Sequence, residues 1–385
     1  MTIKELLGLM IQSNASDLYL TVDSPPMFRS EGITKPYGDS SFNAHQVEDI
    51  ANSLMNERQK AIFAETMEMN LALYYPDIGR FRVNIFRQKN SVGLVFRMIK
   101  MEIETLADLN LPSILNDVCL TKHGLVLLVG GTGTGKSTSL AAMIDHRNST
   151  TTGHIITIED PVEFIHHHKK CIITQREIGM DTLNYSNALK NTLRQAPDVI
   201  LLGEVRDAET MEAAIAFAET GHLCFSTLHA NNANQAIERI VNFFPPEKHA
   251  QLYFQLGLNM RAIISQRLIP TVDNKRAAAI EILIDTPRVK DLIMKRQIDV
   301  LKEAMAAGTQ EGMQTFDQAI FCLYKEERIT YENAMAYADS ANDLRLKIKM
   351  DEVGESPEDA DSDNNKKDDA EDSPFRLKAD EPKHL

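Results

Sequence analysis

The spacing of apolar residues divides the first hundred residues into short helices and strands. At the start of the chain apolar residues recur at helical spacing, at Ile3, Leu6, Leu7, Met10 and Ile11. Residues 17–22 alternate like a strand, and Asn43 with Gln46 forms a capping-box pattern that opens a second helix. Two or three further strands are expected, over residues 71–75, 79–86 and 92–99. The pattern predicts a small α/β domain over residues 1–99.

Beyond residue 112, strand-like apolar runs alternate with helical patterns, which is typical of a parallel sheet with crossover helices. The runs cover residues 125–129, 154–158, 199–202, 223–228 and 278–284. Helices are expected in the gaps and, further on, from Gln235 to about Leu268 and from Pro287 to about Leu346. Residues 100–112 are expected to form a linker, so the second domain would span residues 113–350.

The last segment differs from the rest in composition. From Asp351 onward the chain has 13 acidic and 5 basic residues and almost nothing apolar, which predicts a disordered acidic tail over residues 351–385. The net charge of the whole chain is −14, so the folded body is acidic too. An acidic body argues against a nucleic-acid translocase or helicase, which needs a basic channel. No nucleic-acid partner is expected.

The cysteines and the apolar runs exclude other classes. The four cysteines are isolated and form no C-x-x-C pair, which argues against a zinc ribbon and a disulfide framework. The N-terminus lacks a signal-peptide layout, and no run of 18 or more apolar residues occurs. We expect a cytoplasmic protein with no direct membrane insertion.

A glycine-rich stretch joins one predicted strand to a predicted helix. It reads Gly130, Gly131, Thr132, Gly133, Thr134, Gly135, Lys136, Ser137 and Thr138. The glycines let backbone N–H groups turn toward a polyphosphate, and the helix N-terminus adds about half a positive charge there. Lys136 is expected to reach the β- and γ-phosphates and the Ser137 hydroxyl to ligate Mg²⁺. The stretch predicts ATP and Mg²⁺ as cofactors.

Two strand ends supply carboxylates for hydrolysis. The first is the acidic box of residues 158–163, in which Pro161 stops the strand and leaves the acids, including Glu163, at its carboxyl end. The second is the apolar run 199–202, which is followed by Gly203 and Glu204 as in a Walker B element. Carboxyl ends of parallel strands meet at one edge of a sheet, so these acids are expected beside the phosphate loop.

Arginines gather on the predicted N-terminal sheet. Arg80, Arg82 and Asn84 fall on one face of the strand 79–86, and Arg97 comes from the next strand. A solvated sheet face explains them. In a protein that binds ATP, arginine fingers explain them as well.

Histidines flank another predicted strand. His222 precedes the run 223–228 and His229 follows it, so the two residues either sense phosphate, link neighbouring subunits or simply cap the strand. The run His166, His167 and His168 is interpreted as a solvated loop, because three adjacent side chains cannot all face one metal ion.

Together these motifs resemble the secretion-ATPase superfamily, which drives type II and type IV secretion and type IV pili. The resemblance extends to about Met350 and includes residues 16–18 and 79–84. Extension and secretion motors have a longer N-terminal region and a tetracysteine insert, both missing here, so the chain resembles the pilus-retraction branch. The resemblance implies a RecA-like P-loop ATPase core with a smaller PAS-like N-terminal α/β domain.

The resemblance also implies roles and partners. The branch is similar to a hexameric ring motor that hydrolyses ATP to depolymerise pilin for twitching motility, at the inner-membrane base of the pilus. The implied partners are a retraction motor of the same branch and a membrane platform protein. The implied residue roles are Glu163 as general base, Glu204 supporting Mg²⁺ or its water, His222 and His229 as the histidine-box pair, and Arg82 and Arg97 as arginine fingers.

One stretch departs from the branch. Its main motor carries Ala-Ile-Arg-Asn-Leu-Ile-Arg-Glu where residues 288–295 here read Arg-Val-Lys-Asp-Leu-Ile-Met-Lys. Together with residues 187–197 and the acidic tail, this difference makes the chain resemble a paralogue of the main motor more than the main motor itself. A low-turnover nucleotide-binding adaptor of the retraction motor is therefore the alternative.

Overall fold

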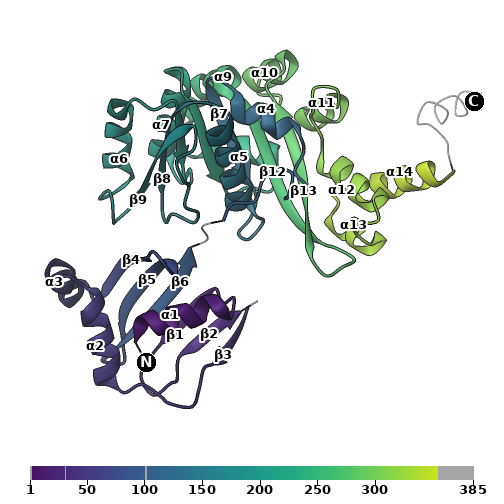
Figure 1. Ribbon diagram of the computed structural model, residues 1–385. Coiled ribbons are helices and arrows are strands. Elements are labelled where there is room, and N and C mark those ends of the chain that lie inside the picture. The colour runs from purple at the N-terminus through teal and green to yellow at the C-terminus, as the bar shows by residue number, and fades with distance from the viewer. Residues whose placement is uncertain (1, 31, 100–101, 354–385) are drawn as a thin grey trace, which may run out of the picture. The chain divides into compact units, whose positions relative to one another are not determined.

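The structure is a computed structural model that describes residues 2–30, 32–99 and 102–353 of the 385-residue chain. Its N-terminal part contains one antiparallel six-stranded sheet in the order β3-β2-β1-β6-β5-β4 (Figure 1). The strands are β1 (Asp17–Leu20), β2 (Met27–Ser30), β3 (Ile33–Pro36), β4 (Glu68–Tyr75), β5 (Gly79–Gln88) and β6 (Ser91–Ile99). The helices are α1 (Ile3–Gln12), α2 (Ala44–Leu54) and α3 (Glu57–Thr66).

The sequence pattern accounts for much of this N-terminal part. The capping box predicted for Asn43 and Gln46 is present at the start of α2. Along β5, Phe81 and its apolar alternates are buried while Arg80 and Arg82 are half-exposed, as the alternation predicts. β2, β3 and α3 were not predicted, because β2 and β3 are short and α3 has little apolar periodicity.

A seven-stranded sheet in the order β13-β12-β7-β11-β10-β8-β9 forms the second core, and every pair from β12 to β9 is parallel (Figure 1). The strands are β7 (Gly124–Val129), β8 (Gly153–Glu159), β9 (Cys171–Glu177), β10 (Val199–Leu202), β11 (Leu223–Leu228), β12 (Met260–Pro270) and β13 (Arg276–Ile284). The helices are α4 (Ile114–Leu120), α5 (Lys136–Thr150), α6 (Tyr185–Thr192), α7 (Ala208–Glu219), α8 (Ala233–Asn242), α9 (His249–Asn259), α10 (Pro287–Met294) and α11 (Leu301–Ala307), with 3-10 turns η1 (Leu193–Gln195) and η2 (Pro246–Lys248). The predicted α/β class is confirmed.

Alternate residues of β7, an interior strand of the sheet, point into two different apolar clusters. Leu125 and Leu127 of β7 pack with residues of α6 to α11. Val126 and Leu128 pack with residues of α4 and α5, and with Leu111 of the expected linker. Helices therefore cover both faces of the sheet, which explains why β7 is a continuous apolar run.

The predictions for two segments of the core were wrong. Residues 260–268 were expected to be helical but form most of β12, which pairs with β7. The run is largely buried on both faces and includes the β-branched pair Ile263 and Ile264, so it carries no clear helical period. Residues 171–177, expected within a helical gap, form the edge strand β9.

Residues 269–277 and 316–353 form a compact unit of their own. Its helices are α12 (Phe316–Lys325), α13 (Tyr331–Tyr337) and α14 (Ala341–Val353). The side chain of Asn333 donates to the Pro270 carbonyl at 2.9 Å. The long helical region expected after Pro287 is thus five separate helices, α10 to α14. The expected acidic tail lies outside the described residues from residue 354. Within them, no helix is both long and apolar enough to cross a bilayer.

Candidate nucleotide-binding site

The glycine-rich stretch has the backbone geometry of a phosphate loop. The fully buried strand β7 ends just before Gly130, and α5 begins at Lys136. Gly135 has a φ of +87°, and a Cβ added there would lie 2.7 Å from the side-chain nitrogen of Gln266 on β12. The Gln266 amide in turn accepts a hydrogen bond from Ser139 at 2.8 Å. A glycine is therefore required where the loop enters the helix, and β12 supports the loop from behind.

Lys136 is folded back over this loop. Its Nζ donates to the carbonyl oxygens of Gly130 and Gly131, at 2.8 and 2.7 Å. Burial lowers the pKa of Lys136, while the nearby carboxylates of Glu204 and Glu163 raise it. These two acids therefore act electrostatically on the same ammonium group, as expected if the loop and the acidic strand ends share one site.

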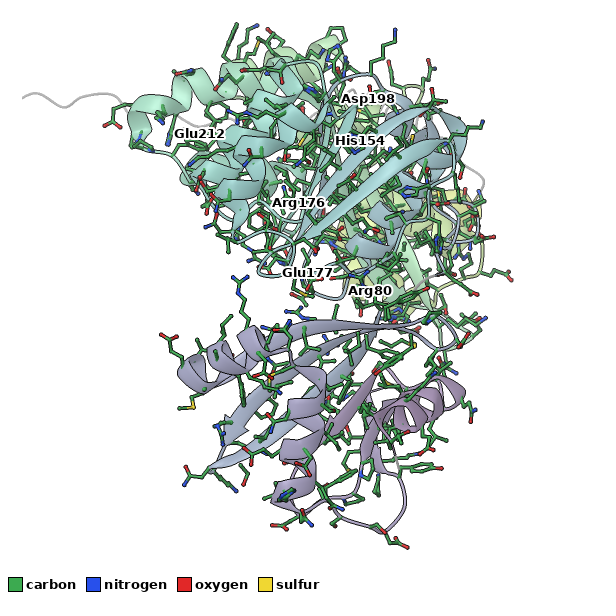
Figure 2. The ribbon with its side chains drawn as sticks, turned by 60° about the vertical axis from the view of Figure 1, so that its left-hand side comes forward. Arg80, His154, Arg176, Glu177, Asp198 and Glu212 are labelled. Atoms are coloured by element: carbon green, nitrogen blue, oxygen red, sulfur yellow. The ribbon has the colours of Figure 1, made fainter. Side chains whose placement is uncertain are left out.

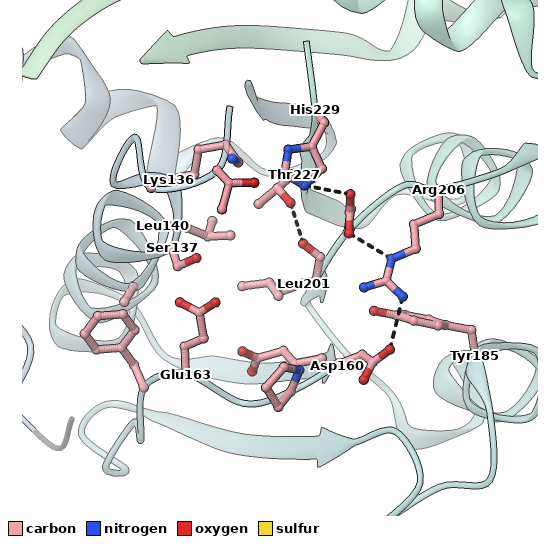
Figure 3. Close-up of a pocket in the computed structure, with 18 of the residues that line it drawn as sticks. Lys136, Ser137, Leu140, Asp160, Glu163, Tyr185, Leu201, Arg206, Thr227 and His229 are labelled. Carbon is pink, nitrogen blue, oxygen red and sulfur yellow. Dashed lines mark hydrogen bonds and ion pairs between the residues drawn. The ribbon is translucent and has the colours of Figure 1, made fainter. Parts of the chain in front are cut away.

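A cavity of about 240 Å³ lies between the loop and the strand ends (Figure 3). The predicted site residues that line it are Thr132, Gly133, Lys136, Ser137, Glu163, Glu204 and His229. The strand ends of β8, β10 and β11 thus meet the phosphate loop at one place, because parallel strands end at the same edge of the sheet.

Both carboxylate oxygens of Glu204 are engaged. Oε1 lies 3.1 Å from Nε2 of His229, and Oε2 accepts a hydrogen bond from Nε of Arg206 at 2.8 Å (Figure 3). Nη1 of the same arginine donates to Asp160 at 3.1 Å. Arg206 therefore joins the Walker B strand end to the acidic box. It was not predicted, and its only signal in the sequence is its place two residues after Glu204.

Glu159, another acid of the predicted acidic box, lies at the end of β8. Its Oε1 accepts hydrogen bonds from Thr157 at 2.6 Å and from Gln175 at 3.3 Å. Burial raises the pKa of Glu159 to about 7, against these hydrogen bonds, which lower it. Glu159 lines the cavity beside Glu163. Near neutral pH it therefore has a protonated population that an exposed glutamate lacks.

Tyr185, from the start of α6, also lines the cavity and was not predicted. Burial raises the pKa of its phenol to about 12. Among the described residues, its hydroxyl has no hydrogen-bond partner. The phenol therefore remains neutral and free to donate a hydrogen bond inside the cavity.

Among the predicted site residues outside the phosphate loop, three do not line this cavity. His222 precedes β11 and His229 follows it, so the seven residue steps between them, at ~3.3 Å each, hold the two about 23 Å apart. The Nδ1 atom of His222 lies 3.0 Å from the Thr220 hydroxyl, a local contact consistent with a capping role. Arg82 and Arg97 are paired across β5 and β6, and Nε of Arg97 donates to Asp17 at 2.8 Å. Their role as arginine fingers stays a prediction.

The donor set constrains the kind of metal that fits. The described residues contain no group of three or more His, Cys, Asp or Glu side chains able to hold a metal ion. Ser137 and Glu204 at the cavity provide oxygen donors of the kind that Mg²⁺ prefers when phosphate supplies further ligands. The histidine run offers no alternative. His166 itself is buried, so the prediction of a fully solvated loop was wrong for this residue.

A buried strand, a glycine-rich loop and a helix that begins with Lys and Ser, faced by carboxylates from neighbouring strand ends, define a P-loop ATPase. The chain belongs to the family of type II/IV secretion system proteins, whose model matches residues 107–360. The motif-based expectation of a secretion ATPase is thereby confirmed.

Individual relatives agree with this. The chain is 55% identical over 351 residues to the type IV pilus ATPase PilU of Pseudomonas aeruginosa, covering 91% of this chain and 92% of the relative. It is 41% identical to the type IV pilus retractation ATPase PilT of the same organism, covering 87% and 97%. The expectation that it resembles the paralogue more than the main motor is confirmed.

A solved structure gives the same result. The crystal structure of the pilus retraction motor PilT with bound ADP superposes with a TM-score of 0.84 at 39% identity, covering 90% of this chain and 99% of that one. The ATPase DotB of Legionella pneumophila gives a TM-score of 0.71 at 25% identity, covering 87% and 95%. Fold, family and the phosphate loop together make this chain a nucleotide-binding ATPase.

Proposed function

We propose that the chain is a Mg-ATP-hydrolysing motor of type IV pilus retraction that acts together with a PilT-type motor. The observation that carries this proposal is one cavity lined by Lys136 and Ser137 on one side and by Glu163 and Glu204 on the other. The identities to PilU and PilT assign this chemistry to pilus retraction and twitching motility.

In this proposal the residues around the cavity divide the work of hydrolysis. Lys136 moves from the carbonyls that it now contacts to the β- and γ-phosphate oxygens. Ser137 and the phosphates would hold Mg²⁺, which would neutralise negative charge on the nucleotide. Both Glu204 oxygens already have partners, so Glu204 would act on the metal through water. Glu163 accepts the proton of the attacking water.

The assembly belongs to the same proposal. Residues 1–99, a linker at 100–112 and residues 113–350 act as domains of a homohexamer, and ATP binds between the core and the N-terminal domain that carries Arg82 and Arg97. Hydrolysis changes the angle between these domains. The motor works in the cytoplasm at the inner-membrane base of the pilus, where a platform protein receives the motion.

Steady-state hydrolysis by the purified protein tests the enzyme. We expect Mg-dependent release of phosphate from ATP, which a Lys136→Ala variant does not show. Wild-type turnover no higher than that of this variant would contradict the motor. Electron microscopy of the ATP-bound protein, alone and mixed with the PilT-type motor, tests the ring. A protein that forms no ring in either sample would contradict the assembly.

The alternative is a low-turnover adaptor of the retraction motor. Residues 288–295, which depart from the main motor, lie in and just after α10, where Lys290 pairs with Asp285 at 2.9 Å. The adaptor predicts tight ADP binding with turnover equal to that of a Glu163→Gln variant. The motor predicts that the wild type exceeds this variant.

A further inference from the structure

The carboxylate of the proposed general base makes no contact, among the described residues, that fixes its position. Glu163 is exposed in a loop between β8 and β9 and lines the cavity. Within the described part of the chain, its carboxylate makes no hydrogen bond or ion pair. Where it points therefore depends on how firmly the backbone of the loop is held.

One side chain of the edge strand β9 holds that backbone on the C-terminal side of Glu163. The Gln175 amide donates from Nε2 to the carbonyl oxygen of Phe164 at 2.9 Å, and its Oε1 accepts from the N–H of His166 at 2.8 Å. The amide thus makes a donor and an acceptor bond to the main chain, as a neighbouring strand would. Its Nε2 also lies 3.3 Å from the Glu159 carboxylate.

A second β9 side chain holds the loop on the other side of Glu163. The carboxylate of Glu177 accepts a hydrogen bond from the N–H of Val162 at 3.2 Å. Figure 2 shows Glu177 at the end of the strands opposite to His154 and Asp198, where β8 also ends at Glu159. Burial raises the pKa of Glu177, and the Val162 bond acts in the opposite direction.

The loop residues on both sides of Glu163 are themselves buried. Val162 is 3% exposed and His166 is 8% exposed. Burial lowers the pKa of His166 to about 4, so its ring is neutral at physiological pH and packs as an uncharged group. An exposed carboxylate between two buried, hydrogen-bonded positions has a short range of motion.

We propose that Gln175, assisted by Glu177, is a positioning residue for Glu163, which rests on the proposed role of Glu163 as general base. Only an amide supplies both the donor for Phe164 and the acceptor for His166, because a carboxylate cannot donate. The bonds cross from the edge strand to the loop. Their loss lets the loop move without disturbing the phosphate loop, which is held from β12.

Steady-state kinetics of Gln175→Glu and Gln175→Met test the proposal. Both variants are similar in size to glutamine, and neither can donate to Phe164. We expect kcat to fall about 10- to 100-fold, because a misplaced catalytic group costs on that order. The KM for ATP and the affinity for Mg-ADP should stay within about threefold of the wild type, because the phosphate loop is untouched. Gln195→Glu, which adds the same charge at an exposed position, is the matched control and should keep wild-type kcat.

Amide hydrogen exchange gives a readout that does not depend on activity. In Gln175→Met, exchange of residues 162–166 should quicken while α5 and β7 stay protected. A kcat equal to that of the wild type would overturn the proposal. A parallel loss of ADP binding and of melting temperature would overturn it too, because it would show a merely structural role.

Failure of the proposed function is distinguishable from failure of this inference. If the wild type itself shows no turnover, the motor proposal falls, and the exchange experiment alone decides the role of Gln175. Unchanged exchange of residues 162–166 in Gln175→Met would then overturn the positioning role.

Discussion

The two sides of the nucleotide cavity are built in different ways. The phosphate side is one continuous segment, residues 130–138, whose internal contacts are local: Lys136 bonds to carbonyls five and six residues away. The acidic side consists of Glu163, Glu204 and His229, which come from the ends of three different strands. Arg206 and Gln175 connect this side through side-chain hydrogen bonds.

Because the two sides are built differently, we expect nucleotide binding and ATP hydrolysis to depend on different residues. In the proposed function, the backbone N–H groups and the helix N-terminus of the phosphate side bind phosphate independently of the acidic side. The acidic side is proposed to contribute charge and to accept a proton, and both depend on the placement of a few side chains. Changes on the phosphate side should therefore abolish binding, and changes on the acidic side should lower kcat with binding retained.

The largest effect is expected for Lys136→Ala. Removing the ammonium leaves the β- and γ-phosphates without their cation, so turnover should fall by about 10³-fold or more. Isothermal titration should show Mg-ATP affinity lost as well. Lys190→Ala, at an exposed position on α6, is the control. If Lys136→Ala bound Mg-ATP like the wild type, the phosphate side would be wrongly assigned.

A smaller effect is expected for Arg206→Gln. Without the guanidinium, Glu204 loses one partner and Asp160 loses its link to the Walker B strand end. We expect kcat to fall about 10-fold with ADP affinity unchanged, because a displaced catalytic group costs rate and leaves the phosphate loop intact. Arg206→Lys keeps the charge but lacks the planar guanidinium that contacts Glu204 and Asp160 through two different nitrogens. It should therefore restore kcat only in part. Loss of ADP binding in Arg206→Gln would contradict the expectation that changes on the acidic side lower kcat and leave binding intact.

Glu159→Gln should change the pH dependence of stability. Burial raises the pKa of Glu159 to about 7 in the folded protein from the ordinary 4.5, so ionisation disfavours the fold. Wild-type stability is therefore unaffected below pH 4.5, falls as the pH rises from 4.5 to 7, and is lower by a constant amount above 7. The glutamine mimics the neutral acid and should gain about 3 kcal/mol at pH 8, from about 2.5 pKa units at ~1.4 kcal/mol each.

Urea titrations from pH 4 to pH 8 measure this difference. Glu238→Gln, on the exposed side of α8, should show no pH-dependent gain and is the control. A gain for Glu159→Gln that did not grow between pH 4.5 and pH 7 would show that Glu159 is not held in its neutral form.

The smallest effect is expected for a pair of glycine variants. Gly135→Ala places a Cβ 2.7 Å from Gln266 at a φ of +87°, whereas Gly131→Ala meets nothing closer than 3.9 Å and has no positive φ. We expect Gly135→Ala to lose about 1–2 kcal/mol of stability, the usual cost of a strained backbone position, and Gly131→Ala to lose less. Equal melting temperatures for the two variants would contradict the claim that β12 supports the phosphate loop at Gly135.

The contrast between the two sides also explains which residues of the cavity could be predicted from the sequence. The phosphate loop is contiguous and flanked by recognisable strand and helix patterns, so the place of Lys136 and Ser137 at the cavity could be predicted directly. The place of Glu163 and Glu204 at the same cavity could be predicted because each follows an apolar strand, and parallel strands end at one edge. These inferences need only local patterns and one rule about sheets.

The rest required pairings that no local pattern contains. Gln175 was missed because residues 171–177 were not recognised as a strand, and its partners depend on the parallel register of β9 with β8. Arg206 was missed because its two partners come from different strand ends. The histidines show the converse. His222 and His229 are close in sequence, but the extended strand between them separates them in space.

The central claim is that Glu163 acts as the general base of hydrolysis and that the phosphate loop binds the nucleotide without its help. Paired measurements on Glu163→Gln, Mg-ATP affinity by titration and single-turnover hydrolysis, test it most directly. We predict affinity within about threefold of the wild type and a hydrolysis rate lower by about 10²- to 10⁴-fold, the usual contribution of a general base. Hydrolysis at the wild-type rate would contradict the claim, and so would loss of both binding and hydrolysis.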